Sequence, residues 1–195
     1  MKYKLNNLYI NGGKKTIFEK KPHWKWPPKS IGKKKEILNY YSNEQKDRIG
    51  YPKVVEKFEK NFAKYLNMKY ALCTNSATSA LFAAFSALEL KKNDEVIVPS
   101  LTFIAPVNAI RYNNANPLFI DSDNYFNIDV LKLVKFLDKN TFFKKGFCYN
   151  KKTKRRISAI IPVHIWGNGV DIKSLLKACR KRNIKIIEDA SESLG

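Results

Sequence analysis

The chain has 195 residues, which is enough for one domain with a hydrophobic core and too few for two large ones. Hydrophobic residues make up 44% of it and aromatic residues 13%, as in a folded protein. Its apolar runs are too short to cross a bilayer, and no apolar stretch follows the basic start, so we expect neither a membrane span nor a secretory signal. The 3 cysteines show neither metal-site spacing nor a disulfide framework, which favours the cytoplasm.

The net charge of +20 allows two interpretations. A nucleic-acid-binding module is one, because lysine and arginine neutralise backbone phosphates. A compositional bias is the other, because Lys, Asn and Ile are all abundant and the lysines are spread along the chain. We favour the bias and expect no nucleic-acid partner, although a basic surface also attracts phosphorylated substrates.

The N-terminal 50 residues differ in pattern from the rest. Gly12-Gly13 marks a turn, and the aromatic, proline-rich stretch 23–28 disfavours a helix. One helix is expected within residues 30–46. We interpret residues 1–50 as an arm that packs on a larger body.

Helical and strand patterns alternate from Pro52 onward. Helices are expected over 52–66, 78–88, 103–112, 129–137 and 171–182, and strands over 70–73, 95–99, 117–121, 157–163 and 184–189. The first of these strands and the helix over 78–88 are expected to be buried, and the basic stretch 138–156 to form a loop or hairpin. This order predicts an α/β fold in which helices cover both faces of a mostly parallel sheet.

Small hydroxyl residues and an aromatic residue follow two of the predicted strands. Segment 74–80 supplies serines and threonines that cap the free N–H groups of the next helix, and the same N–H groups bind phosphate. Phe103 follows the strand over 95–99, where an aromatic side chain can cover a flat ring. Taken alone, each is more simply explained by plain capping or by a core phenylalanine.

Acidic residues and a histidine follow two further strands. The carboxylates of Glu188 and Asp189 suit a pyridine nitrogen, which a carboxylate keeps protonated, although they can also cap a strand end or bind a metal. His164 suits acid–base chemistry or a loop-holding role, and we favour the latter. Because ligands bind outside the carboxyl ends of strands, the motifs together predict a pocket for pyridoxal 5′-phosphate.

The segments that carry these motifs resemble the DegT/DnrJ/EryC1/StrS family of pyridoxal-phosphate-dependent sugar aminotransferases. The resembling segments are 11–13 with 26–27, 58–63, 74–81, 94–103, 161–167 with 170–172, and 187–195. The resemblance implies the large domain of a fold-type-I PLP-dependent transferase, with a mixed, mostly parallel sheet and helices on both faces, incomplete at the C-terminus. We therefore expect an arm over 1–50, a partial PLP-binding large domain over 51–195, and no C-terminal small domain.

The resemblance also implies roles for five residues. Ala77 and Thr78 fall on a Gly-Thr pair that binds the cofactor phosphate, with alanine in place of the glycine. Phe103 falls where an aromatic side chain stacks on the pyridine ring. Asp189 falls on the aspartate that pairs with the pyridine nitrogen. Glu192 falls where many members have Gln or His near the ring hydroxyl.

The family's Schiff-base lysine lies downstream of the Glu-Asp segment, and no lysine of this chain occupies a matching position. We therefore expect that lysine beyond Gly195, no catalytic residue within the chain, and no complete turnover by this chain alone.

The activity implied by the resemblance is transfer of an amino group from an amino acid, glutamate or glutamine, to a keto sugar. The acceptor would be a nucleotide-linked sugar or a cyclitol. The reaction would serve the biosynthesis of a cell-surface polysaccharide or of a secondary metabolite. The full-length form is expected to be a homodimer. Two alternatives stay open: a sugar dehydratase of the same family, in which histidine replaces the lysine, and the basic nucleic-acid-binding module.

Overall fold

The computed structural model describes residues 34–44 and 53–193, which belong to two compact units divided between Ala71 and Leu72. The first unit contains helices α1 (Lys34–Glu44) and α2 (Lys53–Tyr65), so both helices predicted in this region are confirmed. On α2, the Phe58 and Phe62 rings stack with centroids 5.5 Å apart, as residues one turn apart on a helix can. The motifs predicted in segments 11–13 and 23–28 lie outside the described residues, and the arm over 1–50 stays a prediction.

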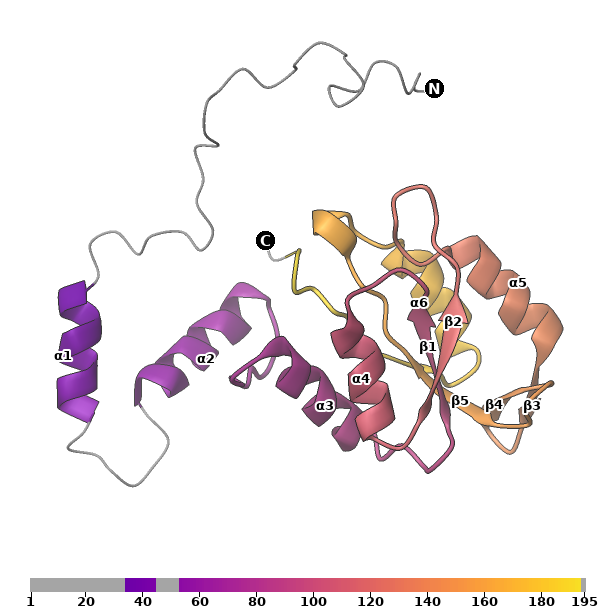
Figure 1. Ribbon diagram of the computed structural model, residues 1–195, viewed down its shortest axis with the longest axis horizontal. Helices are drawn as coiled ribbons and strands as arrows, with labels where there is room; N and C mark the ends of the chain where they lie inside the picture. The colour runs from indigo at the N-terminus through magenta and orange to yellow at the C-terminus, as the bar shows by residue number, and fades with distance from the viewer. Residues whose placement is uncertain (1–33, 45–52, 194–195) are drawn as a thin grey trace, which may run out of the picture. The chain divides into compact units, whose positions relative to one another are not determined.

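The second unit is a six-stranded mixed sheet with helices (Figure 1). Its elements are α3 (Ala77–Ala87), β1 (Glu95–Pro99), α4 (Ile104–Tyr112), β2 (Asn116–Ile120), α5 (Val130–Asn140), β3 (Thr141–Lys144), β4 (Phe147–Asn150), β5 (Arg156–Ile160), α6 (Ile172–Arg180) and β6 (Lys185–Ile186). The sheet order is β2-β1-β5-β4-β3, and β6 also pairs with β5. Strands β2, β1, β5 and β6 are parallel, while β3 and β4 are antiparallel. The mixed, mostly parallel sheet predicted from the sequence is confirmed.

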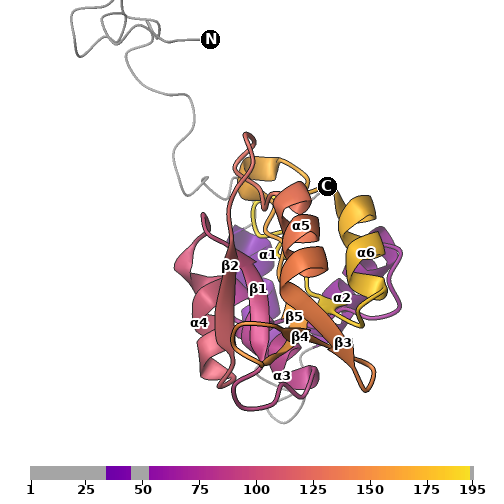
Figure 2. The same ribbon diagram turned by 90° about the vertical axis from the view of Figure 1, so that its right-hand side faces the viewer.

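The helices cover both faces of this sheet, as predicted (Figures 1 and 2). Residues of β1 alternate between two hydrophobic cores, with Val96 and Val98 in the core beneath α3 and α4, and Ile97 in the core beneath α5 and α6. All five residues of β1 are buried. A strand buried on both faces reads as a continuous apolar run, which explains why the sequence located β1 so well.

Three helices of this unit begin at side-chain caps. The side chains of Ser76, Asp129 and Asp171 accept backbone N–H groups from the first turns of α3, α5 and α6, at 3.1, 2.9 and 3.1 Å. Helix α3 is less buried than the sequence suggested: Leu81 and Phe85 face the core, whereas Phe82 is 43% exposed. Its alanine-rich composition hides which face is exposed, because alanine suits both environments.

The strand predicted over 70–73 is wrong. The segment forms no strand with any described residue, and its Tyr70 and Leu72 side chains are 78% and 75% exposed. A short apolar run forms a strand only where another strand accepts and donates its backbone hydrogen bonds, and the sequence alone does not reveal that partner.

Two other predictions are refined by the pairing pattern. The last strand is shorter than predicted. Its partner β5 ends at Ile160, Pro162 beyond it has no N–H to donate, and only a single bridge from Val163 to Asp189 continues the pairing. The stretch 138–156 contains the β3–β4 hairpin. Its turn residues Lys145 and Gly146 both have positive φ (50° and 81°), as a two-residue type I′ turn requires.

Candidate functional site

The carboxyl ends of β1, β5 and β6 border a pocket of about 280 Å³. All five site residues predicted from the sequence line it: Ala77 and Thr78 from the start of α3, Phe103 from the start of α4, and Asp189 and Glu192 from the segment after β6. The remaining lining residues are Leu81, Ala105, Pro106, Val163, Ile165 and Ser191. The topology therefore gathers residues that are far apart in sequence at one end of the sheet.

The start of α3 presents backbone donors to this pocket. Ser76 Oγ accepts the N–H of Ser79 at 3.1 Å, so the cap supplies a hydrogen-bond acceptor for the N–H of the third helical residue. The N–H groups of Ala77 and Thr78 belong to the first turn, where a helix offers no acceptor of its own. Ala77 has helical, negative φ, so alanine fits here without strain. Unpaired N–H groups and the helix dipole at a helix start are chemically suited to an anion such as phosphate.

Phe103 precedes α4 in an extended conformation (φ −64°, ψ 158°). Its side chain is 74% exposed although it lines the pocket. A ring that lines a pocket and remains this exposed offers a face to a flat, apolar ligand.

Asp189 is the buried acid of the pocket, only 7% exposed. Its Oδ1 accepts both the N–H and the hydroxyl of Ser191, at 3.1 and 2.5 Å. Both bonds use the same oxygen, which leaves Oδ2 for another donor. A buried carboxylate is stable only with hydrogen bonds or an opposite charge, so a cationic N–H of a ligand suits this position. Ser191 was not predicted from the sequence, although an Asp-x-Ser spacing is typical of such local turns.

His164 holds a loop beside the pocket, as favoured from the sequence. Its ring is buried, and Nδ1 accepts the N–H of Val170 at 3.1 Å. Because Nδ1 is the acceptor, the proton of the neutral ring is assigned to Nε2, which lies 3.2 Å from the Glu188 carboxylate. Its backbone N–H donates to the carbonyl of Asp189 at 3.1 Å. The loop-holding interpretation is confirmed, and the structure separates the two acids: Asp189 lines the pocket, whereas Glu188 contacts His164.

Glu192 is tied to the same loop. Its Oε2 accepts the backbone N–H of Trp166 at 2.6 Å. Trp166 lies in the short 3-10 turn Ile165–Gly167 with a left-handed backbone (φ 51°, ψ 32°). Trp166 was not predicted as a site residue, because a tryptophan in a sequence gives no sign that its backbone will adopt positive φ.

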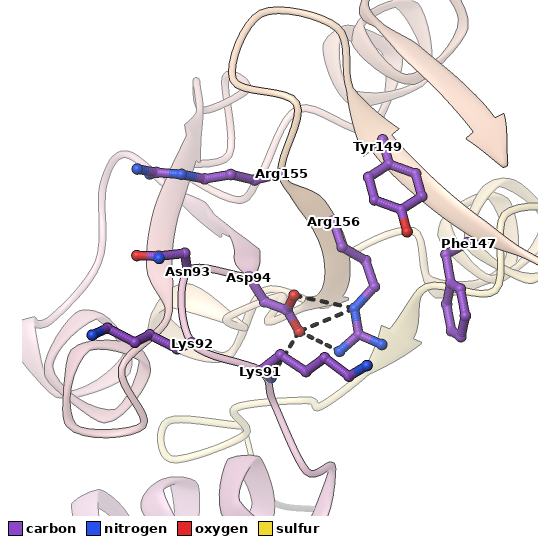
Figure 3. Close-up of a pocket in the computed structure, with 8 residues that line it drawn as sticks. All are labelled: Lys91, Lys92, Asn93, Asp94, Phe147, Tyr149, Arg155 and Arg156. Carbon is purple, nitrogen blue, oxygen red and sulfur yellow. Dashed lines mark hydrogen bonds and ion pairs between the residues drawn. The ribbon is translucent and has the colours of Figure 1, made fainter. Parts of the chain in front are cut away.

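A second pocket, of about 270 Å³, lies at the amino ends of β1 and β5 (Figure 3). Four of its lining residues are basic, and the buried Asp94 lies among them. Asp94 accepts from the Arg156 guanidinium, the Ser158 hydroxyl (2.6 Å) and the Lys91 N–H (2.9 Å). Because these bonds join the loop before β1 to the start of β5, we interpret this network as structural.

Comparison with known proteins identifies the family. Residues 32–195 match the profile of the DegT/DnrJ/EryC1/StrS aminotransferase family. The chain belongs to this family. It is 37% identical over 142 residues to a GDP-perosamine synthase of Caulobacter vibrioides (72% of this chain, 34% of that protein). It is 34% identical over 172 residues to the GDP-perosamine synthase of Escherichia coli O157:H7 (87% and 42%). The chain thus spans less than half the length of these relatives.

Similar solved structures share the fold. An aminotransferase from Psychrobacter cryohalolentis aligns with a TM-score of 0.71 and 25% identity, over 89% of this chain and 40% of that one. A GDP-4-keto-6-deoxymannose-3-dehydratase with a trapped PLP-glutamate geminal diamine aligns with a TM-score of 0.64 and 26% identity, over 81% and 39%. The predicted fold, that of a fold-type-I PLP-dependent transferase large domain, is confirmed. No helix among the described residues is long and apolar enough to cross a membrane.

Proposed function

We propose that the pocket at the carboxyl ends of β1, β5 and β6 binds pyridoxal 5′-phosphate. The observation that carries this proposal is the gathering of an anion site, an exposed aromatic ring and a buried carboxylate in one pocket. The N–H groups of Ala77 and Thr78 would hold the phosphate, Phe103 would cover one face of the ring, and Asp189 Oδ2 would accept the ring N–H. The remaining oxygen of Glu192 would lie near the ring hydroxyl.

The cofactor, when bound, supplies an electron sink for a carbanion that forms on the substrate. Asp189 would keep the ring nitrogen protonated through a charge-assisted hydrogen bond, and Phe103 would exclude water from one ring face. No lysine is among the described residues that line the pocket, so we propose that these residues hold and orient the cofactor without attaching it covalently.

For the whole protein, we propose transfer of an amino group from glutamate or glutamine to the keto group of a nucleotide-linked sugar. Support comes from the names of its relatives, which include the GDP-perosamine synthases and a dTDP-3-amino-3,6-dideoxy-alpha-D-galactopyranose transaminase of Aneurinibacillus thermoaerophilus. Sugar dehydration is the second candidate, because a dehydratase is among the similar structures. A homodimeric full-length form and a cytoplasmic location stay predictions.

The cofactor proposal is tested by titration with pyridoxamine 5′-phosphate, followed by calorimetry. This probe carries the ring and the phosphate but no aldehyde, so it cannot react with the many lysines of the chain. We expect Asp189→Asn to weaken binding by about 10- to 150-fold, since a hydrogen bond to a charged group contributes roughly 1.5–3 kcal/mol.

The matched control is Phe143→Ala, which removes a ring that is 58% exposed on β3, away from the pocket. Its affinity for the probe should equal that of the wild type. Equal affinities of the wild type and Asp189→Asn would contradict the proposal.

A further inference from the structure

Three aromatic side chains lie exposed near the loop that Glu192 holds. Trp166 is 70% exposed, Tyr125 is 69% exposed and Phe126 is 44% exposed. The rings of Phe126 and Trp166 meet edge-on, with centroids 5.1 Å apart and planes at 67°. This contact is a favourable aromatic geometry that supports the indole and leaves most of its surface open to solvent.

The backbone of Trp166 is strained and firmly held. A left-handed conformation is uncommon for a bulky residue and persists only where the surroundings impose it. Glu192 accepts the N–H of Trp166, as described above. Asn127, only 2% exposed, accepts the N–H of Ile165 at 3.1 Å and donates to the carbonyl of Asn168 at 3.0 Å. One buried side chain thus holds the backbone on both sides of Trp166, at Ile165 and Asn168.

This loop lies at the rim of the candidate cofactor pocket. Ile165 and Glu192 both line that pocket, and both are bonded to or adjacent to Trp166. The touching rings of Phe126 and Trp166 form an exposed apolar surface beside this pocket, and a contiguous exposed apolar surface on a folded chain commonly marks a binding site. Strain at such a position points in the same direction.

We propose that Trp166, supported by Phe126, stacks on the nucleobase of the substrate. The inference rests on the proposed function, because that function supplies a nucleotide-linked sugar whose reacting end enters the pocket. Stacking suits a base because every base has a π-face, and a base–aromatic contact contributes roughly 1–3 kcal/mol. A pyranose ring also has a flat face, so the test must separate the base from the sugar.

The test uses the intact 195-residue chain with three probes: GDP, mannose 1-phosphate and pyrophosphate. The variant Trp166→Asn removes the indole, and asparagine tolerates positive φ, so the loop should keep its conformation. Tyr112→Ala, at the far end of α4, removes a ring that is 61% exposed and serves as the control. Calorimetry at a fixed, near-physiological salt concentration limits the contribution of the high net charge.

We expect Trp166→Asn to weaken GDP binding by about 5- to 150-fold, the range that corresponds to 1–3 kcal/mol. Pyrophosphate and mannose 1-phosphate should bind both proteins equally, and Tyr112→Ala should match the wild type. The proposal is overturned if the wild type does not bind GDP, if Trp166→Asn binds GDP as the wild type does, or if only mannose 1-phosphate loses affinity. It is also overturned if Trp166→Asn abolishes self-association in sedimentation experiments and leaves GDP binding intact.

Titration of the same proteins with pyridoxamine 5′-phosphate separates this inference from the cofactor proposal. A wild type that binds GDP through Trp166 and ignores the cofactor probe would contradict the cofactor proposal alone. A wild type that binds the cofactor probe and shows no Trp166 dependence for GDP would contradict the stacking site alone.

Discussion

Removal of the Arg156 guanidinium should destabilise the second unit strongly. The Arg156 and Asp94 side chains are only 16% and 6% exposed, and they connect the start of β5 to the loop before β1 (Figure 3). Arg156→Met keeps most of the side-chain volume and removes the charge. Asp94 would then remain buried without its cationic partner.

The expected cost follows from what Asp94 loses and keeps. Breaking a buried ion pair by removing one partner typically costs about 3–5 kcal/mol. Asp94 retains the Ser158 hydroxyl and the Lys91 N–H, at 2.6 and 2.9 Å, which soften the loss. The guanidinium also lies 5.0 Å from the centre of the Phe147 ring. We therefore expect Arg156→Met to lower the free energy of unfolding by about 2–4 kcal/mol.

Urea unfolding followed by circular dichroism measures this loss, provided that the slope m is unchanged. Arg155→Met is the matched control, because Arg155 is exposed, lines the same pocket and shares no bond with Asp94. That variant should stay within about 0.5 kcal/mol of the wild type. Adding Asp94→Asn to Arg156→Met should recover part of the loss, since the unpaired charge is then gone. Unfolding of Arg156→Met and Arg155→Met at the same urea concentration would show that the Arg156–Asp94 pair does not stabilise the unit.

Three further predictions concern the core, the thiols and pH. Phe85→Ala should lower the free energy of unfolding by about 3–5 kcal/mol, because Phe85 is fully buried, whereas Phe82→Ala on the exposed side of α3 should cost much less. In the native chain, the exposed Cys73 should react quickly with a thiol reagent at pH 8. Burial raises the pKa of the Cys179 thiol to about 12, so Cys179 should react slowly at the same pH. Hydrogen bonds from Ser174 lower the pKa of Asp171. The ionised carboxylate therefore stabilises the fold above the ordinary carboxyl pKa, and this stabilisation is lost as pH falls through the lowered pKa. Asp171→Asn should flatten the dependence of the urea midpoint on pH in this acidic range.

Each of these has a clear contrary outcome. Similar losses for both phenylalanine variants would place α3 differently from the structure. Rapid reaction of Cys179 in the folded chain would contradict its burial. An unchanged acid profile for Asp171→Asn would mean that the ionised carboxylate of Asp171 stabilises the start of α6 no more than its protonated form does.

Much of the fold was predictable because the local sequence pattern of these helices and strands agrees with the place that each takes in the folded unit. The apolar run of β1 is followed by a polar turn, and Asp129 and Asp171 mark helix starts through side chains that only a helix terminus satisfies. The strand over 70–73 was predicted wrongly because apolar composition does not reveal whether a pairing strand exists.

The sequence predicted which residues line the candidate site, but not how those residues contact one another. Positions such as Phe103 and Asp189 follow strands, and parallel strands bring their carboxyl ends together. The internal bonds of the site were not predictable, because they depend on side-chain contacts between distant segments. Asn127 bonds to the loop of residues 165–168, and Glu192 bonds to the backbone of Trp166.

In the proposed function, Asp189 holds a proton on the ring nitrogen of the bound cofactor. Nitrogen NMR of ring-labelled pyridoxamine 5′-phosphate on the wild type and on Asp189→Asn tests it most directly, at a pH where the ring nitrogen of the free compound is deprotonated. We expect the shift of a protonated ring nitrogen on the wild type and of a deprotonated one on Asp189→Asn. A deprotonated ring nitrogen on the wild type, or the same shift on both proteins, would contradict it.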